Sequence, residues 1–173
     1  MKAFALGLLL SVVSACGPGQ EPARAQAPAV RRGPPIEFSF GTTQGGLLSS
    51  ASTRGRVTAL LFVTTYDLAS QLEARQLDAV LRRRRPRANA GAVVLEAPKY
   101  AMLADAFRAS LELSYPVALA DDATRLGAGS FGRIDRVPTL IVLDREGRLV
   151  VRKPGLATRE QISSALATAS RRD

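Results

Sequence analysis

The feature that most constrains the fold is the segment TALLFVTTYDLASQ, residues 58–71. Thr58 to Thr65 is rich in β-branched and apolar residues, which is typical of a strand buried on both faces. Asp67 stands where a helix N-cap belongs, because its carboxylate can accept bonds from the free N–H groups of the first turn. Beyond it, a helical spacing predicts one broad apolar side made of Leu68, Leu72, Leu77, Val80 and Leu81. The segment therefore predicts a strand that runs straight into the N-terminus of a helix.

Composition limits the chemistry that this chain can perform. The chain has 173 residues, enough for one ordinary domain with a core, and it contains no histidine and a single cysteine, Cys16. Zinc, copper and haem sites that need imidazole or thiolate are thereby excluded from the folded part, as are Ser-His-Asp and Cys-His nucleophile systems. Carboxylates at Asp121 and Asp122 leave a Mg²⁺ or Ca²⁺ site open, but two adjacent acids before a helix favour a cap. We expect no metal and no cofactor.

The first 35 residues have the features of an export signal followed by a tether. Residues 1–15 carry Lys2, an apolar run and small residues, which predicts a secretory signal peptide too short to span a membrane. Val13-Ser14-Ala15-Cys16 resembles the lipobox of bacterial lipoproteins, so Cys16 is expected to carry lipid; an ordinary signal peptide with a chance cysteine is the alternative. Residues 16–35 are rich in proline and alanine and predict a semi-extended tether of up to roughly 60 Å. The folded domain is expected to span 36–173.

The remaining elements are predicted from hydrophobic periodicity and from the turn and cap residues that bound each segment. Strands are expected at 36–40, 90–96, 138–144 and 148–152, with a turn at Gly45-Gly46. Residues 115–122 are expected to lead into a short helix that ends near Gly127 to Gly129. Residues 98–113 predict a helix with Leu103, Ala106, Phe107 and Leu111 on one face. A capping box, Thr158-x-x-Gln161, opens a last helix. The side chains that this helix is expected to bury are Ile162, Ala165, Leu166 and Ala169.

Arginines give the chain its positive charge. The formal net charge is +9, which favours anionic surfaces in general. The densest run is Arg82, Arg83, Arg84, Arg85 and Arg87. Cations at a helix C-terminus complement the helix dipole and Pro86 stops the helix, so this explanation is favoured over a dedicated anion site. Because the chain is expected to be exported, nucleic acid is not an expected partner.

The junction at 58–71 resembles the first strand-to-helix junction of the thioredoxin superfamily, and specifically its TlpA/ResA-like envelope branch, related to the peroxiredoxins. That branch reads roughly F-W-A-x-W-C-x-x-C, and the two cysteine positions fall on Asp67 and Ser70. The Val137-Pro138-Thr139 strand start, the Asp144-x-x-Gly147 turn and the terminal helix match as well. The resemblance implies an α/β thioredoxin-like fold, with a central mixed β-sheet flanked by helices, an N-terminal strand or hairpin and a central insertion. It also implies that Pro138 is cis.

The replaced cysteines decide the functional expectation. A thiolate at a helix N-terminus attacks a disulfide and a second cysteine resolves the product, which neither an aspartate nor a serine can do. We therefore expect a redox-inactive, thioredoxin-like pseudoenzyme that binds an envelope protein or an extended peptide on the face formed by Tyr66, Asp67, Val137 and Pro138.

Three alternatives stay open. One is a thiol-disulfide oxidoreductase or peroxiredoxin-like enzyme of cell redox homeostasis. Another is a basic envelope module that binds polyanions through the arginine run. In the third, Asp67 and Ser70 only fill a site that drift has emptied. The expected location is the bacterial cell envelope, with a lipid anchor in the outer membrane on the periplasmic side, because Gly17 carries no inner-membrane retention signal.

Overall fold

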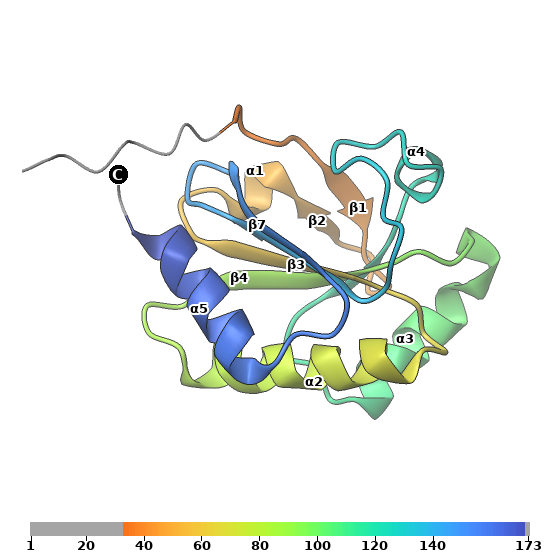
Figure 1. The fold of residues 1–173 in the computed structure, drawn as a ribbon. Coiled ribbons are helices and arrows are strands. Elements are labelled where there is room, and N and C mark those ends of the chain that lie inside the picture. Colours follow the sequence, from red (N-terminus) through yellow and green to blue (C-terminus); the bar gives the residue numbers. More distant parts are fainter. Residues whose placement is uncertain (1–32, 172–173) are drawn as a thin grey trace, which may run out of the picture.

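The computed structural model describes residues 33–171, and its centre is a mixed sheet of five strands in the order β5-β4-β3-β6-β7. The central strand β3 (Thr58–Val63) pairs in parallel with β4 (Asn89–Val94) and antiparallel with β6 (Thr139–Leu143). At the edges, β5 (Val117–Leu119) lies parallel to β4, and β7 (Leu149–Pro154) lies antiparallel to β6. This arrangement confirms the predicted central mixed sheet (Figure 1).

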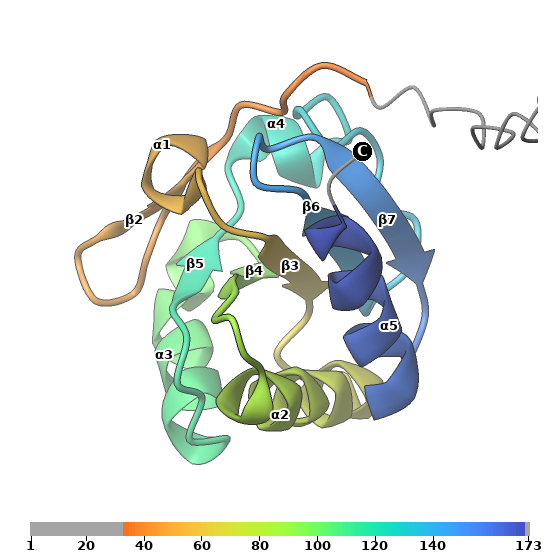
Figure 2. The same cartoon turned by 90° about the vertical axis from the view of Figure 1, so that its left-hand side faces the viewer.

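The strand β3 is buried on both faces, as its composition predicts. Side chains alternate between faces along a strand, so Ala59, Leu61 and Val63 point to one side and Leu60 and Phe62 to the other. The first side packs against α2 (Leu68–Arg83), α3 (Ala101–Ser110) and α5 (Arg159–Ser170). Figure 2 shows these helices around the sheet, with α2 and α5 next to each other.

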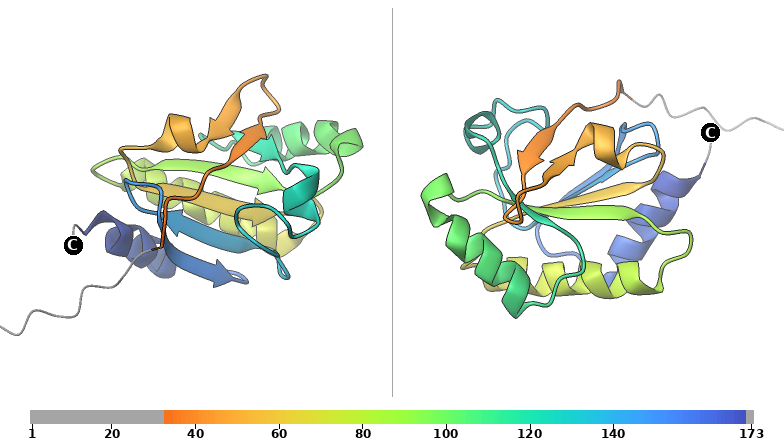
Figure 3. Two further views of the ribbon diagram at one scale, coloured as in Figure 1. Left: turned by 90° about the horizontal axis from the view of Figure 1, so that it is seen from above. Right: turned by 180° about the vertical axis from the view of Figure 1, so that it is seen from behind.

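The opposite face of the sheet is covered by the N-terminal hairpin. Strands β1 (Ser39–Gly41) and β2 (Leu47–Ser49) pair antiparallel around the expected Gly45-Gly46 turn, and the hairpin bonds to β5 through Thr43 N and Val117 O at 3.0 Å. Its residues Phe38 and Phe40 join Phe62 and Phe131 in an aromatic cluster. The hairpin therefore closes a second core. Figure 3 shows the hairpin over the sheet from two sides.

Two short elements complete the domain on this side. A one-turn helix, α1 (Ser50–Thr53), was not expected, although Ser49 and Ser52 form its capping box. The helix α4 (Asp122–Arg125) begins at Asp121, whose carboxylate accepts from Thr124 N at 2.8 Å, so the expected cap at this acidic pair is confirmed. Asp122 instead pairs with Arg125 in an ion pair.

Element ends shift by a few residues from the sequence predictions, and two helix faces were predicted only in part. The segment 98–113 divides into a 3-10 turn η1 (Pro98–Tyr100) and α3, which buries Ala104 and Phe107 while Leu103 is 51% exposed and Ala106 is exposed. In α2 the buried stripe begins with Ser70, Glu73, Ala74 and Leu77, and not with Leu68 and Leu72. By contrast, α5 buries Ile162, Ala165, Leu166 and Ala169, and its Thr158–Gln161 capping box is present, as expected.

The predicted signal peptide, the lipidation site Cys16 and nearly all of the tether lie outside the described residues. Within 33–171, no helix has the length and apolar character needed to cross a bilayer.

Candidate functional site

The candidate site lies at the end of the sheet where β3 leads into α2. Asp67 is the N-cap of α2, as predicted, with an extended backbone. Its Oδ2 accepts from Ser70 N at 2.8 Å and from Ser70 Oγ at 2.7 Å, and its Oδ1 accepts from Ala69 N at 3.4 Å. These bonds, above all the one from the Ser70 hydroxyl, lower the pKa of the Asp67 carboxyl. Asp67 therefore stays ionised and serves as a helix cap.

The Ser70 side chain is fully buried, and its hydroxyl is hydrogen-bonded to the Asp67 carboxylate that caps the helix. Its Oγ donates to Asp67 and accepts from Thr64 N at 3.4 Å, which ties the end of β3 to the first turn of α2. With its hydroxyl pointing at a carboxylate and shielded from solvent, Ser70 has no free access to a substrate. The pair Asp67–Ser70 is thus a structural unit that contains no sulfur.

The loop between β3 and α2 is held rigidly and presents its aromatic residue outward. Thr65 donates from its N–H and from its Oγ1 to Glu96 Oε1, at 2.6 and 2.5 Å, and its carbonyl accepts from Gln71 Nε2 at 3.0 Å. Tyr66, the next residue, is 80% exposed. A fixed backbone with an exposed aromatic side chain loses little conformational entropy on contact with a partner.

The structure brings the Val137-Pro138 segment to the same end. β3 and β6 are antiparallel with Phe62 opposite Thr139, so the residues after β3 and those before β6 are neighbours. The Val137-Pro138 bond is cis, as the resemblance implied, and Pro138 O accepts from Gly155 N at 2.7 Å. Among residues 33–171 the N–H and C=O of Val137 have no hydrogen-bond partner, so this backbone is free to pair with another chain.

Exposed apolar side chains surround this junction. Leu68 is 77% and Leu72 46% exposed on α2, and Leu156 is 45% exposed in the loop between β7 and α5. That loop is fixed at both ends, through Gly155 to Pro138 O and through Ala157 N to Glu73 Oε2 at 2.9 Å. We call Tyr66, Leu68, Leu72 and Leu156 the apolar rim. Leu68 and Leu72 therefore do not continue the apolar side that packs on the core through Leu77.

A buried carboxyl, Glu73, lies one turn beyond Ser70, and sequence reasoning missed it. The side chain is fully buried, its Oε2 is held by Ala157 N, and its Oε1 has no hydrogen-bond partner within the described part of the chain. Burial raises the pKa of Glu73 to about 7, partly offset by the Ala157 N–H and by the charge of Lys153. Its position beside Ala74 and four residues before Leu77 would have placed it on the buried stripe, had the helix register been known.

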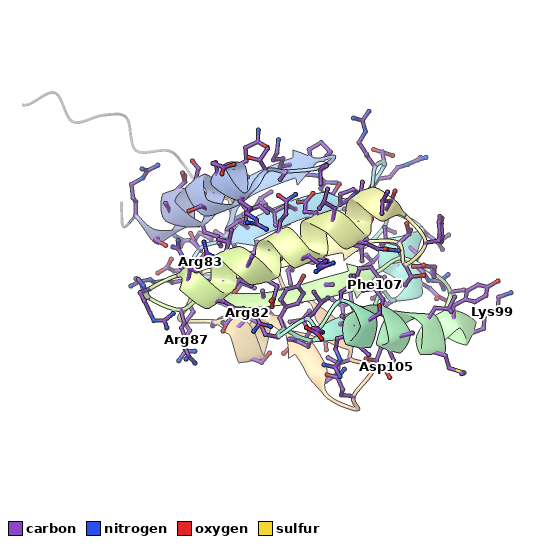
Figure 4. The ribbon with its side chains drawn as sticks, turned by 90° about the horizontal axis from the view of Figure 1, so that it is seen from below. Arg82, Arg83, Arg87, Lys99, Asp105 and Phe107 are labelled. Atoms are coloured by element: carbon purple, nitrogen blue, oxygen red, sulfur yellow. The ribbon has the colours of Figure 1, made fainter. Side chains whose placement is uncertain are left out.

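The arginine run lies at the opposite end of α2. The helix ends at Arg83, ahead of the cis bond at Pro86. At this end the backbone N–H of Arg84 donates to Leu81 O, and Arg85 Nη1 donates to Arg84 O at 2.8 Å, which confirms that part of the run closes the helix end. Arg82 pairs with Asp78 one turn earlier. The Arg84 side chain instead reaches α5, where it donates to Leu166 O at 3.0 Å and to Ser170 Oγ. Figure 4 shows Arg82, Arg83 and Arg87 gathered at this end, with Lys99 at the other.

The described residues contain no group of three or more metal-ligating side chains. The residues of the candidate site present carboxyl, hydroxyl, amide and apolar groups together with the backbone of Val137.

No model of a known protein family matches the sequence, and no curated protein matches it. Solved structures do match. One is a thiol:disulfide interchange protein of the thioredoxin family from Chlorobium tepidum TLS, with 23% identity over 81% of this chain and 97% of that one and a TM-score of 0.65. A DsbF homologue from Corynebacterium diphtheriae has 16% identity, covers 86% and 96%, and has a TM-score of 0.67.

The exposed lipoprotein thioredoxin of Streptococcus pneumoniae strain TIGR4 has 20% identity over 76% of this chain and 98% of that one, with a TM-score of 0.60. At these identities the likeness establishes the architecture. The mixed sheet, the flanking helices and the N-terminal hairpin, together with these neighbours, show that the chain has a thioredoxin-like fold.

Proposed function

We propose that this protein is a redox-inactive, thioredoxin-like binding module of the bacterial cell envelope, which captures an extended polypeptide segment at the end of the sheet where β3 meets α2. The observation that carries the proposal is the combination found at one helix N-terminus. A carboxylate and a buried hydroxyl stand there, at the two positions where the family resemblance expects thiols, and exposed apolar side chains surround them.

Each part of the surface has a role in this binding. The unpaired N–H of Val137 would donate to the backbone of the incoming segment and its C=O would accept from it, which forms one rung of a β-type ladder. The apolar rim would cover apolar side chains of that segment, because exposed apolar groups gathered at one end gain free energy when a partner removes them from water. The fixed loops mean that little of this gain is lost in ordering the site.

An envelope location agrees with the sequence and with the neighbours. The N-terminal features predict export and lipid attachment at Cys16, and one structural neighbour is described as an exposed lipoprotein thioredoxin. We place the anchor in the outer membrane on the periplasmic side, following the residue after Cys16.

Thiol-disulfide exchange is the rival function, since the structural neighbours include thiol:disulfide interchange proteins. The exchange requires a thiolate in the protein to attack a disulfide, and the sequence holds no cysteine apart from Cys16. We therefore expect no reduction of insulin by dithiothreitol-recycled protein above the rate of dithiothreitol alone. Turnover that depends on the protein would overturn the proposal.

The direct test is site-specific photocrosslinking in intact cells. A benzophenone amino acid is placed at Leu68, which is 77% exposed in the apolar rim, and in a second strain at Leu126, which is 83% exposed at the end of α4. The two positions match in exposure and apolar character, so random collision labels both. We expect discrete covalent adducts with another polypeptide from position 68 and none from position 126.

The adducts should then depend on the rim. In the Tyr66→Ala/Leu72→Ala background we expect the position-68 adducts to fall at least tenfold at unchanged protein level. Equal adducts from both positions, or adducts insensitive to the rim variant, would show that this end of the sheet is not a binding site.

A further inference from the structure

A cavity lined by arginines lies at the end of the sheet opposite the candidate site. It measures about 440 Å³ and is bordered by Arg56 before β3, Arg84 and Arg87 after α2, and Arg145 in the turn between β6 and β7. No acidic residue lines it among the described residues. We call it the arginine cavity.

The charges in this cavity are not neutralised within residues 33–171. The side chains of Arg56, Arg87 and Arg145 form no ion pair and no hydrogen bond there. Arg84 bonds only to neutral oxygens, and its Nε is buried without a partner. Burial also lowers the pKa of Arg84, which reflects the cost of holding a cation away from water. Four positive charges in one hollow repel each other, so binding of an anion there is electrostatically favourable.

The positive surface continues beyond the cavity. A second hollow of about 790 Å³ adjoins it on the side of α5, where Arg83, Arg85 and Arg159 face a single acid, Glu160. Arg82, Arg83 and Arg87 project from this end of the molecule in Figure 4. An anionic surface would therefore meet several guanidinium groups at once.

The N-terminal segment enters the domain beside this cavity. Pro35 forms a bridge with Arg148, and Ile36 N donates to Gly147 O at 2.9 Å, so the entry point lies on the turn that carries Arg145. The same turn bonds to the loop of Arg56 through Gly55 N and Arg145 O at 2.8 Å. Only residues 17–34 separate Pro35 from Cys16 in the sequence, and Figure 1 shows the chain entering at the end of the domain away from the start of α2.

We propose that the arginine cavity docks the domain on a membrane by binding the phosphate groups of anionic lipids. Guanidinium groups suit this ligand, because their forked N–H donors bind phosphate oxygens in pairs and are more weakly hydrated than ammonium groups. A lipid on Cys16 would keep this end of the domain within the reach of the tether, up to roughly 60 Å from the bilayer, so that the cavity meets the lipid surface often. Docking would then turn the apolar rim away from the membrane. The inference uses the expected anchor for orientation and does not depend on peptide binding.

The test measures binding of residues 16–173 carrying Cys16→Ser, produced without the predicted signal peptide, so that neither an acyl group nor the apolar signal segment holds the protein on the bilayer. Cosedimentation is compared between vesicles of phosphatidylcholine alone and vesicles containing about 30% phosphatidylglycerol. The Arg56→Gln/Arg145→Gln variant removes two cavity charges. The control Arg75→Gln/Lys99→Gln removes two exposed charges elsewhere, so both variants have the same net charge.

We expect the wild type to prefer the anionic vesicles, and the cavity variant to bind them about fivefold more weakly for each arginine removed. The control variant should stay within about twofold of the wild type, and 0.5 M NaCl should abolish the preference because it screens the charges. Equal losses in the two variants would reduce the effect to net charge and overturn the proposal.

A free anion is the remaining competitor. Binding of soluble glycerol phosphate that raises the melting temperature, without any preference for anionic vesicles, would make the cavity a small-molecule site and also overturn membrane docking. Neither outcome changes the expected crosslinking at the apolar rim. Membrane docking and peptide binding can therefore be refuted independently.

Discussion

At the scale of residues, three polar side chains on the first turns of α2 define what the candidate site can do. Asp67 and Ser70 hydrogen-bond to each other, and Asp67 also caps the helix N-terminus, so both side chains serve a structural role. Glu73 is different, because it is fully buried with one oxygen bound to Ala157 N and the other without a partner among the described residues. It is the titratable group in this region whose charge the fold disfavours.

Glu73 predicts a specific pH dependence of stability. Its pKa is raised from 4.5 to about 7, so between these values the folded state holds a proton that the unfolded chain releases. Raising the pH through this window therefore lowers the free energy of unfolding, by up to on the order of 3 kcal/mol. Glu73→Gln keeps an acceptor for Ala157 N and cannot ionise, so urea unfolding between pH 5 and 8 should lose this slope.

Glu146→Gln serves as the control, since Glu146 is an exposed turn residue. Its urea midpoints should follow those of the wild type at every pH. If Glu73→Gln kept the wild-type slope, the buried carboxyl would not be the group that titrates.

At the scale of elements, the N-terminal hairpin depends on one close approach to the sheet. Gly91 in β4 lies under Leu48 of β2, and a Cβ at position 91 would lie 2.2 Å from Leu48 Cδ2. Leu48 is only 3% exposed and belongs to the second core, so it has little room to move. The absence of a side chain at 91 lets the hairpin close over the sheet.

Gly91→Ala is therefore expected to lower the free energy of unfolding by about 1–3 kcal/mol, as overpacking of a filled core does. Gly41→Ala is the control, because nothing lies within 4 Å of a Cβ there and its φ is not in the left-handed region. A double-mutant cycle with Leu48→Ala should show that the two losses are not additive, because the truncated leucine makes room for the new methyl group. Additive losses would place the strain elsewhere.

At the scale of the whole molecule, the sheet separates two surfaces of opposite character. The apolar rim and the free backbone of Val137 lie where β3 ends, and the arginine cavity lies where β3 and β4 begin. The N-terminal segment enters at the basic end (Figure 1). This polarity suits a domain that is held on a membrane at one end and binds a partner at the other.

The two surfaces should act independently, because no residue lines both and the rigid sheet lies between them. The Arg56→Gln/Arg145→Gln variant should give unchanged crosslinking from position 68 in spheroplast extracts, and Tyr66→Ala/Leu72→Ala should leave vesicle binding within about twofold. Combining the four substitutions should add the two losses. A coupling in either direction would show that membrane docking and partner binding share a conformational change.

Local chemistry determined most of the elements of this protein from sequence alone. The apolar β-branched run predicted β3, Asp67 and Thr158 predicted two helix caps, and the spacing of Ile162, Ala165, Leu166 and Ala169 predicted the buried face of α5. Each of these depends on interactions within a few residues, which a sequence displays directly. The family resemblance added the thioredoxin-like fold and the cis bond before Pro138.

Only the tertiary structure decided which side of α2 faces inward and what gathers at each end of the sheet. The spacing predicted the inward position of Leu77 but also included Leu68 and Leu72, which are exposed. Packing against α5 and the loop before it turned Glu73 and Ala74 inward instead. Arg56 and Arg145 are distant from each other in sequence and from the run at 82–87. The pairing of β3 with β6 places Arg56 near Arg145, and the fold places Arg84 and Arg87 in the same cavity. Burial and charge clustering are sums over contacts between distant segments, so they exist only once the chain has folded.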